Sequence, residues 1–232
     1  MHLGVLPTER LRRGPYAEAS AAAQPADPRA QGPYAVAGSI PEYWRLIRPL
    51  LDGPVAAAQA PIPEDLLQRQ QHLKAAAYFL DATLAGVCRL DSGEATRPTH
   101  ALVFLIEFGR EPAEGETGDA WIHGCNAERT DLRCAEVAAV LAGYLRSLGW
   151  HARGHVQNDT ALDLAVLAQR AGVAKAVDGV LRMPFSQRGF RIGVVTTDLE
   201  LTCDDPIAAD ESLDWPDEAA RQGVGGTRPA FE

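Results

Sequence analysis

The sequence predicts a protein of the α/β or α+β class with a mixed sheet, because helical and strand-like segments alternate along the chain. Its 232 residues are enough for one domain with extensions. A hydrophobic fraction of 46% suits a globular core, and an aromatic fraction of 6% means that Ala, Val and Leu fill most of it.

Residues 1–60 are rich in Pro, Ala and Gly. Proline lacks an amide donor and restricts the residue before it, so long regular structure is not expected in this segment. One short helix is expected over residues 42–51, with Pro41 at its first turn. We interpret residues 1–60 as an N-terminal arm that wraps over the domain or packs on a partner.

The first long helix is expected from Pro63 to about Leu90. Its apolar residues recur at helical spacing and form one stripe, made up of Leu66, Leu73, Ala77, Leu80, Leu84 and Val87. At 1.5 Å per residue such a helix is roughly 40 Å long. An uninterrupted apolar run at residues 101–106 then predicts a central strand that is buried on both faces.

A loop rich in Gly and Glu, residues 109–124, leads to a second long helix over residues 127–148. The apolar stripe of this helix consists of Cys134, Val137, Leu141, Tyr144, Leu145 and Leu148. Gly149 suits a C-terminal cap, because glycine adopts the left-handed conformation at little cost. Residues 150–156 alternate between polar and apolar, which predicts a short strand.

The last third of the chain carries one more helix and two more strands. The helix, residues 161–171, is apolar almost all round and is therefore expected to be buried, with Asp159 or Thr160 as its N-cap. Strands are expected at residues 180–182 and 190–201, separated by a turn at residues 186–189.

The formal net charge of −9 excludes two classes of partner. Nucleic acids and anionic lipids both bind basic surfaces, so neither a nucleic-acid nor a membrane partner is expected. No apolar run approaches the ~20 residues of a spanning helix, and the stretch after Arg12-Arg13 is too polar for an export signal. We therefore expect a cytoplasmic protein. Acidic residues crowd residues 208–232, which we interpret as a mobile tail.

The sharpest local pattern is the row His151, Arg153 and His155. Residues two apart on a strand share a face, so these side chains should line up opposite apolar neighbours. A row of imidazole, guanidinium and imidazole groups suits a carboxylate or phosphate ligand. The alternative is a solvated face of a half-buried strand, which explains the same alternation.

Metal binding is the weaker interpretation of the histidines. On a strand, His151 and His155 lie about 13 Å apart at roughly 3.3 Å per residue, which is too far to share one ion. His123 and Cys125 flank a glycine and suit one metal, but no further ligands join them at recognisable spacing. The 109–124 loop also offers candidate general acids or bases, or simply solvated charges: Glu111, Glu114, Glu116 and Asp119.

Three segments together resemble one known family. The segment "YLRSLGWHAR" spans residues 144–153, "ALDLAVLAQRAG" spans residues 161–172, and "VVTTDLEL" is followed by "DDPI" at residues 204–207. This order is similar to that of the corrinoid-dependent reductive dehalogenases, and the similarity spans about residues 62–207. The domain organisation we expect is thus an arm (1–60), a dehalogenase-like α+β domain (61–207) and an acidic tail (208–232).

The resemblance implies a nitroreductase-like α+β fold and a bound corrinoid, cobalamin. It also implies two iron–sulfur clusters in the complete enzymes, but this chain lacks the closely spaced cysteines that such clusters need, so no cluster is expected here. The family's catalytic tyrosine motif is not recognisable, and Tyr78 and Tyr144 lie on apolar helix faces that predict core positions.

Three functions are compatible with these features. The first is an N-terminal module of a cobalamin-dependent reductive dehalogenase that acts as a scaffold, with the catalytic corrinoid and ferredoxin portion in cis or as a separate subunit. The second is a self-contained cobalamin-binding reductase that takes electrons from an external donor. The third is a small cytosolic protein that binds an anion at His151, Arg153 and His155.

Overall fold

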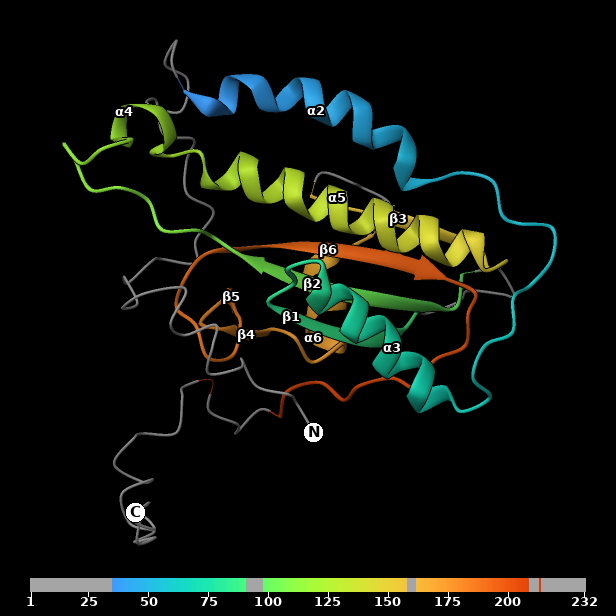
Figure 1. Ribbon diagram of the computed structural model, residues 1–232. Coiled ribbons are helices and arrows are strands. Elements are labelled where there is room, and N and C mark those ends of the chain that lie inside the picture. Colours follow the sequence, from blue (N-terminus) through green and yellow to red (C-terminus); the bar gives the residue numbers. More distant parts are fainter. Residues whose placement is uncertain (1–34, 91–97, 158–161, 209–212, 214–232) are drawn as a thin grey trace, which may run out of the picture.

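The computed structural model describes residues 35–90, 98–157, 162–208 and 213. Its centre is a sheet of four strands in the order β1-β2-β6-β3 (Figure 1). These strands are β1 (Leu84–Arg89), β2 (His100–Glu107), β6 (Phe190–Thr197) and β3 (Ala152–His155). The α+β class is confirmed. The pairing differs from the mixed sheet expected, because all three strand pairs are antiparallel.

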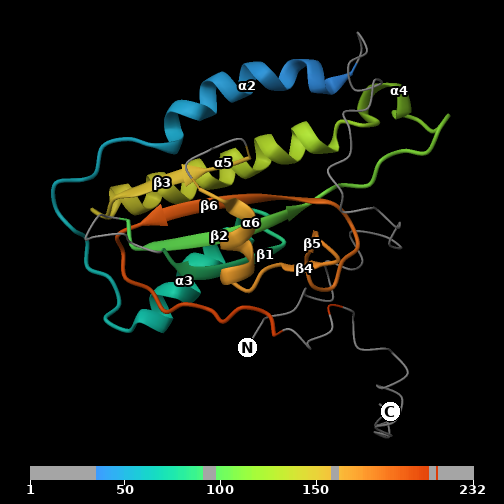
Figure 2. The ribbon, with the colours of Figure 1, turned by 180° about the vertical axis from the view of Figure 1, so that it is seen from behind.

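Helices cover both faces of this sheet (Figures 1 and 2). On one face lie α3 (Leu66–Phe79) and α5 (Asn126–Ser147), which enclose a core with β2 residues such as Phe104. On the other face lies α6 (Leu164–Arg170), whose Leu167 packs into a second core with Val103 and Val194. Because both faces are covered, every residue of β2 is buried, as the apolar run at residues 101–106 predicts.

The helix expected over residues 63–90 is wrong in its second half. Asp65 caps the N-terminus of α3 by accepting a hydrogen bond from the Leu67 amide at 2.9 Å, and the helix ends at Phe79. Asp81 then adopts φ of 74°, which a helix cannot contain, and the chain turns into β1. Leu84 and Val87 thus belong to a strand, and their helical spacing is coincidental.

The helix expected over residues 127–148 is confirmed as α5, and a further layer lies on it. The segments η2 (Val36–Ser39), α2 (Ile40–Ile47) and η3 (Arg48–Leu51) come from the N-terminal arm, and α2 lies along α5 (Figure 1). The arm is held by Arg146, which donates hydrogen bonds to the carbonyls of Leu50 at 2.9 Å and Ala152 at 2.8 Å. Residues 35–60 therefore pack against the domain.

The end of the second long helix also holds the arm. Gly149 has φ of 93°, as expected for the residue that follows a helix C-terminus. A Cβ at this position would lie 2.7 Å from the carbonyl oxygen of Ala58. The Ala56 amide donates to the Arg146 carbonyl at 2.9 Å, and the Ala60 amide donates to the Leu148 carbonyl at the same distance.

The last third of the chain differs from expectation in detail. The helix α6 begins at Leu164, and Asp163 caps it by accepting hydrogen bonds from the next amides; Asp159 and Thr160 lie outside the described residues. The strand expected at residues 180–182 is β5 (Val180–Arg182), and it pairs with β4 (Lys175–Val177), which the sequence analysis missed. The final strand, β6, ends at Thr197, four residues before the expected end.

Beyond β6 the chain crosses the sheet edge at β1 and continues past residue 207. The Lys175 ammonium donates to the Ala208 carbonyl at 2.9 Å, and the Phe185 amide donates to the Leu213 carbonyl at 2.8 Å. Contacts with the domain thus extend into the start of the segment interpreted as a tail, while residues 209–212 and 214–232 lie outside the described residues. Within the described ranges, no helix has the length and apolar character needed to cross a bilayer.

Candidate functional site

The predicted row on β3 is only partly exposed. His151 and Arg153 are exposed, whereas His155 is only 5% exposed. The Nε2 atom of His155 lies 3.0 Å from the hydroxyl of Thr196 on the neighbouring strand, which in turn donates to the Arg153 carbonyl at 3.4 Å. The structure therefore places His155 in the sheet's hydrogen-bond network, and only two members of the row are accessible at the surface.

The opposite face of β3 packs as the alternation predicts. A Cβ at Gly154 would lie 2.7 Å from Leu51 and 3.0 Å from the Cβ of Ala138 on α5. Ala152 and Gly154 therefore face α5, and Arg153 points away from it. The small residue is required here because α5 and the arm approach the strand so closely.

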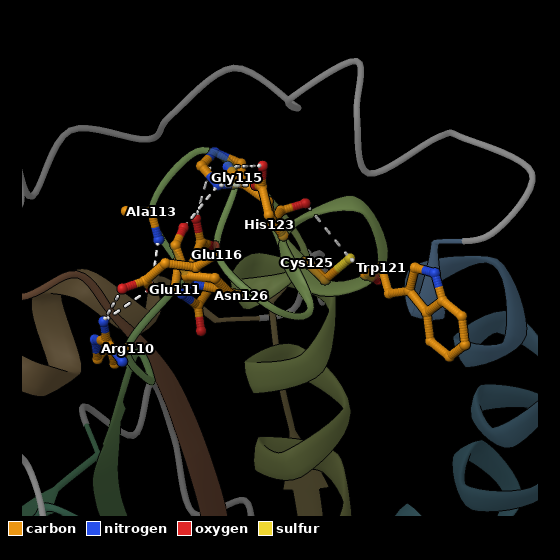
Figure 3. Close-up of polar contacts among 11 residues, drawn as sticks. Arg110, Glu111, Ala113, Gly115, Glu116, Trp121, His123, Cys125 and Asn126 are labelled. Atoms are coloured by element: carbon orange, nitrogen blue, oxygen red, sulfur yellow. Dashed lines mark hydrogen bonds and ion pairs between the residues drawn. The ribbon is translucent and has the colours of Figure 1, made fainter.

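His123 and Cys125 do not converge on a common point (Figure 3). The Nδ1 atom of His123 lies 3.2 Å from Asp119 and 3.3 Å from the Pro112 carbonyl, while the Cys125 thiol lies 3.8 Å from the Trp121 carbonyl. Within the described residues, no three His, Cys, Asp or Glu side chains are grouped in a way that suits a metal ion. The described geometry therefore gives no support to a shared metal at this pair.

The acidic residues of the 109–124 loop fold the loop itself (Figure 3). Glu111 accepts a hydrogen bond from the Asn126 side chain at 2.9 Å, and Asp119 accepts from the Gly115 amide at 3.0 Å. Glu116 pairs with Arg110 at 2.9 Å and accepts from the Ala113 amide. That amide, and after it the Arg110 charge, lowers the pKa of Glu116.

Each of these acids except Glu114 thus has a partner in the loop or at the start of α5, and Glu114 is exposed. Asn126, the first residue of α5, joins the loop to the helix because its side chain bonds both the amide and the carbonyl of Gly109 at 3.0 Å. The arrangement orders the loop above the N-terminus of α5. It favours the solvated-loop alternative over a general acid or base.

The sequence analysis missed an ionic group beside the start of β6. The Nε atom of Arg191 lies 3.0 Å from Asp131 on α5, and the guanidinium stacks over the Phe108 ring at 5.1 Å from its centroid. Burial raises the pKa of Asp131, and the nearby Arg191 charge opposes this shift. Burial also raises the pKa of the Cys134 thiol, which lies one turn further along α5. No spacing in the sequence predicts this group, because its members are up to 83 residues apart in the chain.

A second group of polar contacts that the sequence did not predict involves the "DDPI" motif. Asp204 accepts a hydrogen bond from the Val87 amide at 2.7 Å and pairs with the Lys74 ammonium at the same distance. Its own amide donates to the Val87 carbonyl at 2.8 Å. The motif therefore fastens the chain after β6 to the outer edge of β1.

At two points of the sheet the described residues leave no room for a corrinoid. A Cβ at Gly193 would lie 2.2 Å from the Phe104 ring, and one at Gly86 would lie 2.1 Å from the Ala171 carbonyl oxygen. Side chains and backbone already fill both faces at these points, where a flat macrocycle would need an open surface. The resemblance alone suggests this cofactor.

The fold and its packing thus define an α+β protein whose antiparallel sheet is covered on both faces. No protein-family model matches the chain, and no curated protein sequence matches it. Solved structures do match. The chain is 53% identical to the catabolic reductive dehalogenase NpRdhA in complex with 3-bromo-4-hydroxybenzoic acid, with a TM-score of 0.76 over 90% of this chain and 30% of that one.

A second solved reductive dehalogenase, described for B12-dependent dehalogenation, is 51% identical, with a TM-score of 0.79 over 98% of this chain and 33% of that one. The resemblance to the corrinoid-dependent reductive dehalogenases is therefore confirmed over nearly the whole chain, and with it the nitroreductase-like fold class. The chain spans about a third of the length of these solved chains.

Proposed function

We propose that this chain is a scaffolding module of a cobalamin-dependent reductive dehalogenase, equivalent to its N-terminal part, and that it does not catalyse dehalogenation by itself. The observation that carries this proposal is the match itself. Identity of 51–53% extends over 90–98% of this chain but over only 30–33% of the relatives. A segment related so closely to one third of an enzyme is best understood as one structural part of such an enzyme.

The packing of the domain supports a scaffold. Both faces of the sheet are filled, and the conspicuous polar groups serve to fold the chain: Asp204 fastens the β1 edge and Arg146 fastens the arm. The four cysteines lie in separate places, in β1, before α5, within α5 and after β6, and three of them are buried. We infer that the corrinoid and the electron-transfer clusters belong to a catalytic portion, in cis or as a separate subunit.

The experiment that tests this proposal is a halide-release assay. The purified chain is incubated with hydroxocobalamin, freed of unbound ligand, and supplied with reduced methyl viologen and 3-bromo-4-hydroxybenzoic acid. We expect bromide release no higher than that of a free-cobalamin control, with full-length NpRdhA as the positive reference. Release well above the control would instead favour the second function, a self-contained reductase.

A binding titration addresses the third function, an anion-binding protein. His151 and Arg153 are the exposed members of that row, so binding of inorganic phosphate or benzoate should weaken when Arg153 is replaced by Ala. Calorimetric titration of the parent and of Arg153→Ala separates the cases. Tight binding that is lost in the variant would support the anion-binding function.

A further inference from the structure

One flank of α2 carries large apolar side chains that face solvent. Ile40, Trp44 and Ile47 point into the core, as their spacing along the helix requires. About a quarter turn away, Tyr43 is 54% exposed and Leu46 is 69% exposed, and Leu50 in the following η3 is 57% exposed. The other flank carries Arg45 and Arg48. The helix is therefore apolar on two sides, although only one of them contacts the domain.

The helix α5 has an exposed apolar row of its own. Val140 is 53% exposed and Tyr144, one turn later, is 50% exposed, which corrects the expectation that Tyr144 lies in the core. Arg133 occupies the same strip and pairs with Asp81 at the end of α3 at 2.6 Å. Arg146, on the other side of the helix, contacts the carbonyls of the arm. The strip therefore lies between α2 and α3.

The two rows lie on the same side of the molecule. In Figure 1, α2 lies above α5 and the two helices run in the same direction. In a right-handed helix seen from its N-terminal end, successive residues turn clockwise. With α2 above α5 in this end-on view and its buried side facing α5, Tyr43 and Leu46 fall on the right of α2. Val140 and Tyr144 fall on the right of α5.

We propose that this surface, the α2–α5 face, is the docking site for the catalytic remainder of a reductive dehalogenase. The α2–α5 face consists of Tyr43, Leu46, Leu50, Val140 and Tyr144. This inference rests on the proposed function and adds where the contact is made.

Two further observations identify this occupant. The solved relatives contain about twice as much chain outside the matched segment as within it, so a large partner surface exists in those proteins. Clustered apolar side chains that are half or more exposed are typical of interfaces, and tyrosine is enriched there.

The test places this chain in a complete enzyme. The matched segment of NpRdhA is replaced by this chain, and the chimera is compared with its Leu46→Glu and Tyr144→Glu variants. Val166→Glu is the control, because Val166 is also exposed, at 45%, but lies on α6 over the other face of the sheet. The same substitutions are made in the isolated chain. Thermal unfolding and dehalogenation are measured for the chimeras.

We expect Leu46→Glu and Tyr144→Glu to lower the Tm of the chimera by several degrees and to reduce its activity. Val166→Glu should leave both near the parent values, and all three isolated variants should unfold like the isolated parent. An active chimera that tolerates both face substitutions overturns the docking site but leaves the module function standing. A chimera that neither folds nor dehalogenates, beside active NpRdhA, overturns the module function as well.

A second copy of this chain is the competing occupant. Light scattering on the isolated chain measures this directly. We expect a monomer across the working concentration range. A dimer that Leu46→Glu dissociates and Val166→Glu does not would assign the face to self-association and overturn the proposal.

Discussion

At the scale of single residues, Asp204 holds the chain after β6 against the sheet. Its carboxylate accepts from the Val87 amide and pairs with Lys74, and both side chains of the pair are only 18% exposed. We expect Asp204→Asn to lower the free energy of unfolding by about 1–3 kcal/mol, because a charge-assisted hydrogen bond is lost in a partly buried site. The neighbouring Asp205 is exposed, so Asp205→Asn should change little. Urea unfolding of the three proteins measures the difference, and equal losses would contradict this role.

His100, at the start of β2, gives the protein a dependence on pH. Burial, and after it the Arg89 charge, lowers the pKa of His100, while Glu200 acts in the opposite direction. The unfolded chain, with a histidine pKa of about 6.5, therefore binds the proton more readily than the folded one. Stability contributed by neutral His100 is thus present above that value and is lost as the pH falls below it.

The variant His100→Gln removes this titration. We expect its free energy of unfolding to fall less than that of the parent between pH 7 and pH 5, whatever its stability at pH 7. Urea unfolding at intervals across this range provides the measurement. Parallel curves for the two proteins would show that His100 does not contribute.

At the scale of elements, the end of α5 is one of the places where the arm packs most closely on the domain. Gly149 and Gly179 both have positive φ, but a Cβ at Gly149 would meet Ala58 and Gln59 at 2.7 Å, whereas one at Gly179 would meet nothing within 4 Å. Gly179→Ala should therefore cost only the backbone strain, about 1 kcal/mol. Gly149→Ala should cost roughly 1–3 kcal/mol more, because the arm must also move away.

Thermal unfolding of the two variants, with limited proteolysis of residues 52–60, separates these costs. The arm should become more susceptible to protease in Gly149→Ala, but not in Gly179→Ala. If both variants lose the same stability and resist protease equally, the arm does not depend on this contact.

Most elements could be predicted from the sequence where the apolar residues followed either a helical or a strand spacing throughout. The strand at residues 101–106 and the helix over residues 127–148 both appeared within a few residues of their observed bounds. The segment over residues 80–90 was misassigned because β1 is buried almost throughout, and an all-apolar strand satisfies a helical stripe equally well. The available signal was Gly86, whose lack of a Cβ admits the Ala171 carbonyl. Likewise, Asp178-Gly179 marks the tight hairpin between β4 and β5.

The candidate site was harder to predict than the fold. Alternation along residues 150–156 correctly separated the two faces of β3. It does not reveal how deeply each side chain is buried, and His155 is buried against Thr196. Ion pairs such as Asp131 with Arg191 depend on the register between distant elements, which no local pattern contains. The family motifs, in contrast, indicated the relationship to the dehalogenases, but they did not indicate which residues carry any chemistry.

At the scale of the whole molecule, the cysteines provide a test of our proposal that the iron–sulfur clusters belong to a separate catalytic portion. Cys88, Cys125 and Cys134 are buried, whereas Cys203 is exposed, although partial desolvation by the surrounding protein raises the pKa of its thiol. Binding a cluster would require several thiolates at one place. After anaerobic reconstitution we expect iron and acid-labile sulfide well below one cluster per chain. Stoichiometric uptake with a visible absorbance shoulder would contradict the assignment of the clusters to another portion.

The order of strands has a consequence for how this protein is made. The central pair joins β2 to β6, and more than eighty residues of chain separate the paired Glu107 and Phe190. Neither core can close during synthesis until β6, the last strand of the sheet, has left the ribosome. Until then the hairpin of β1 and β2 exposes apolar residues on both faces, a state prone to aggregation. We therefore expect folding in milliseconds to seconds, as is usual for distant strand pairing, and a requirement for chaperones that lasts until β6 has emerged from the ribosome.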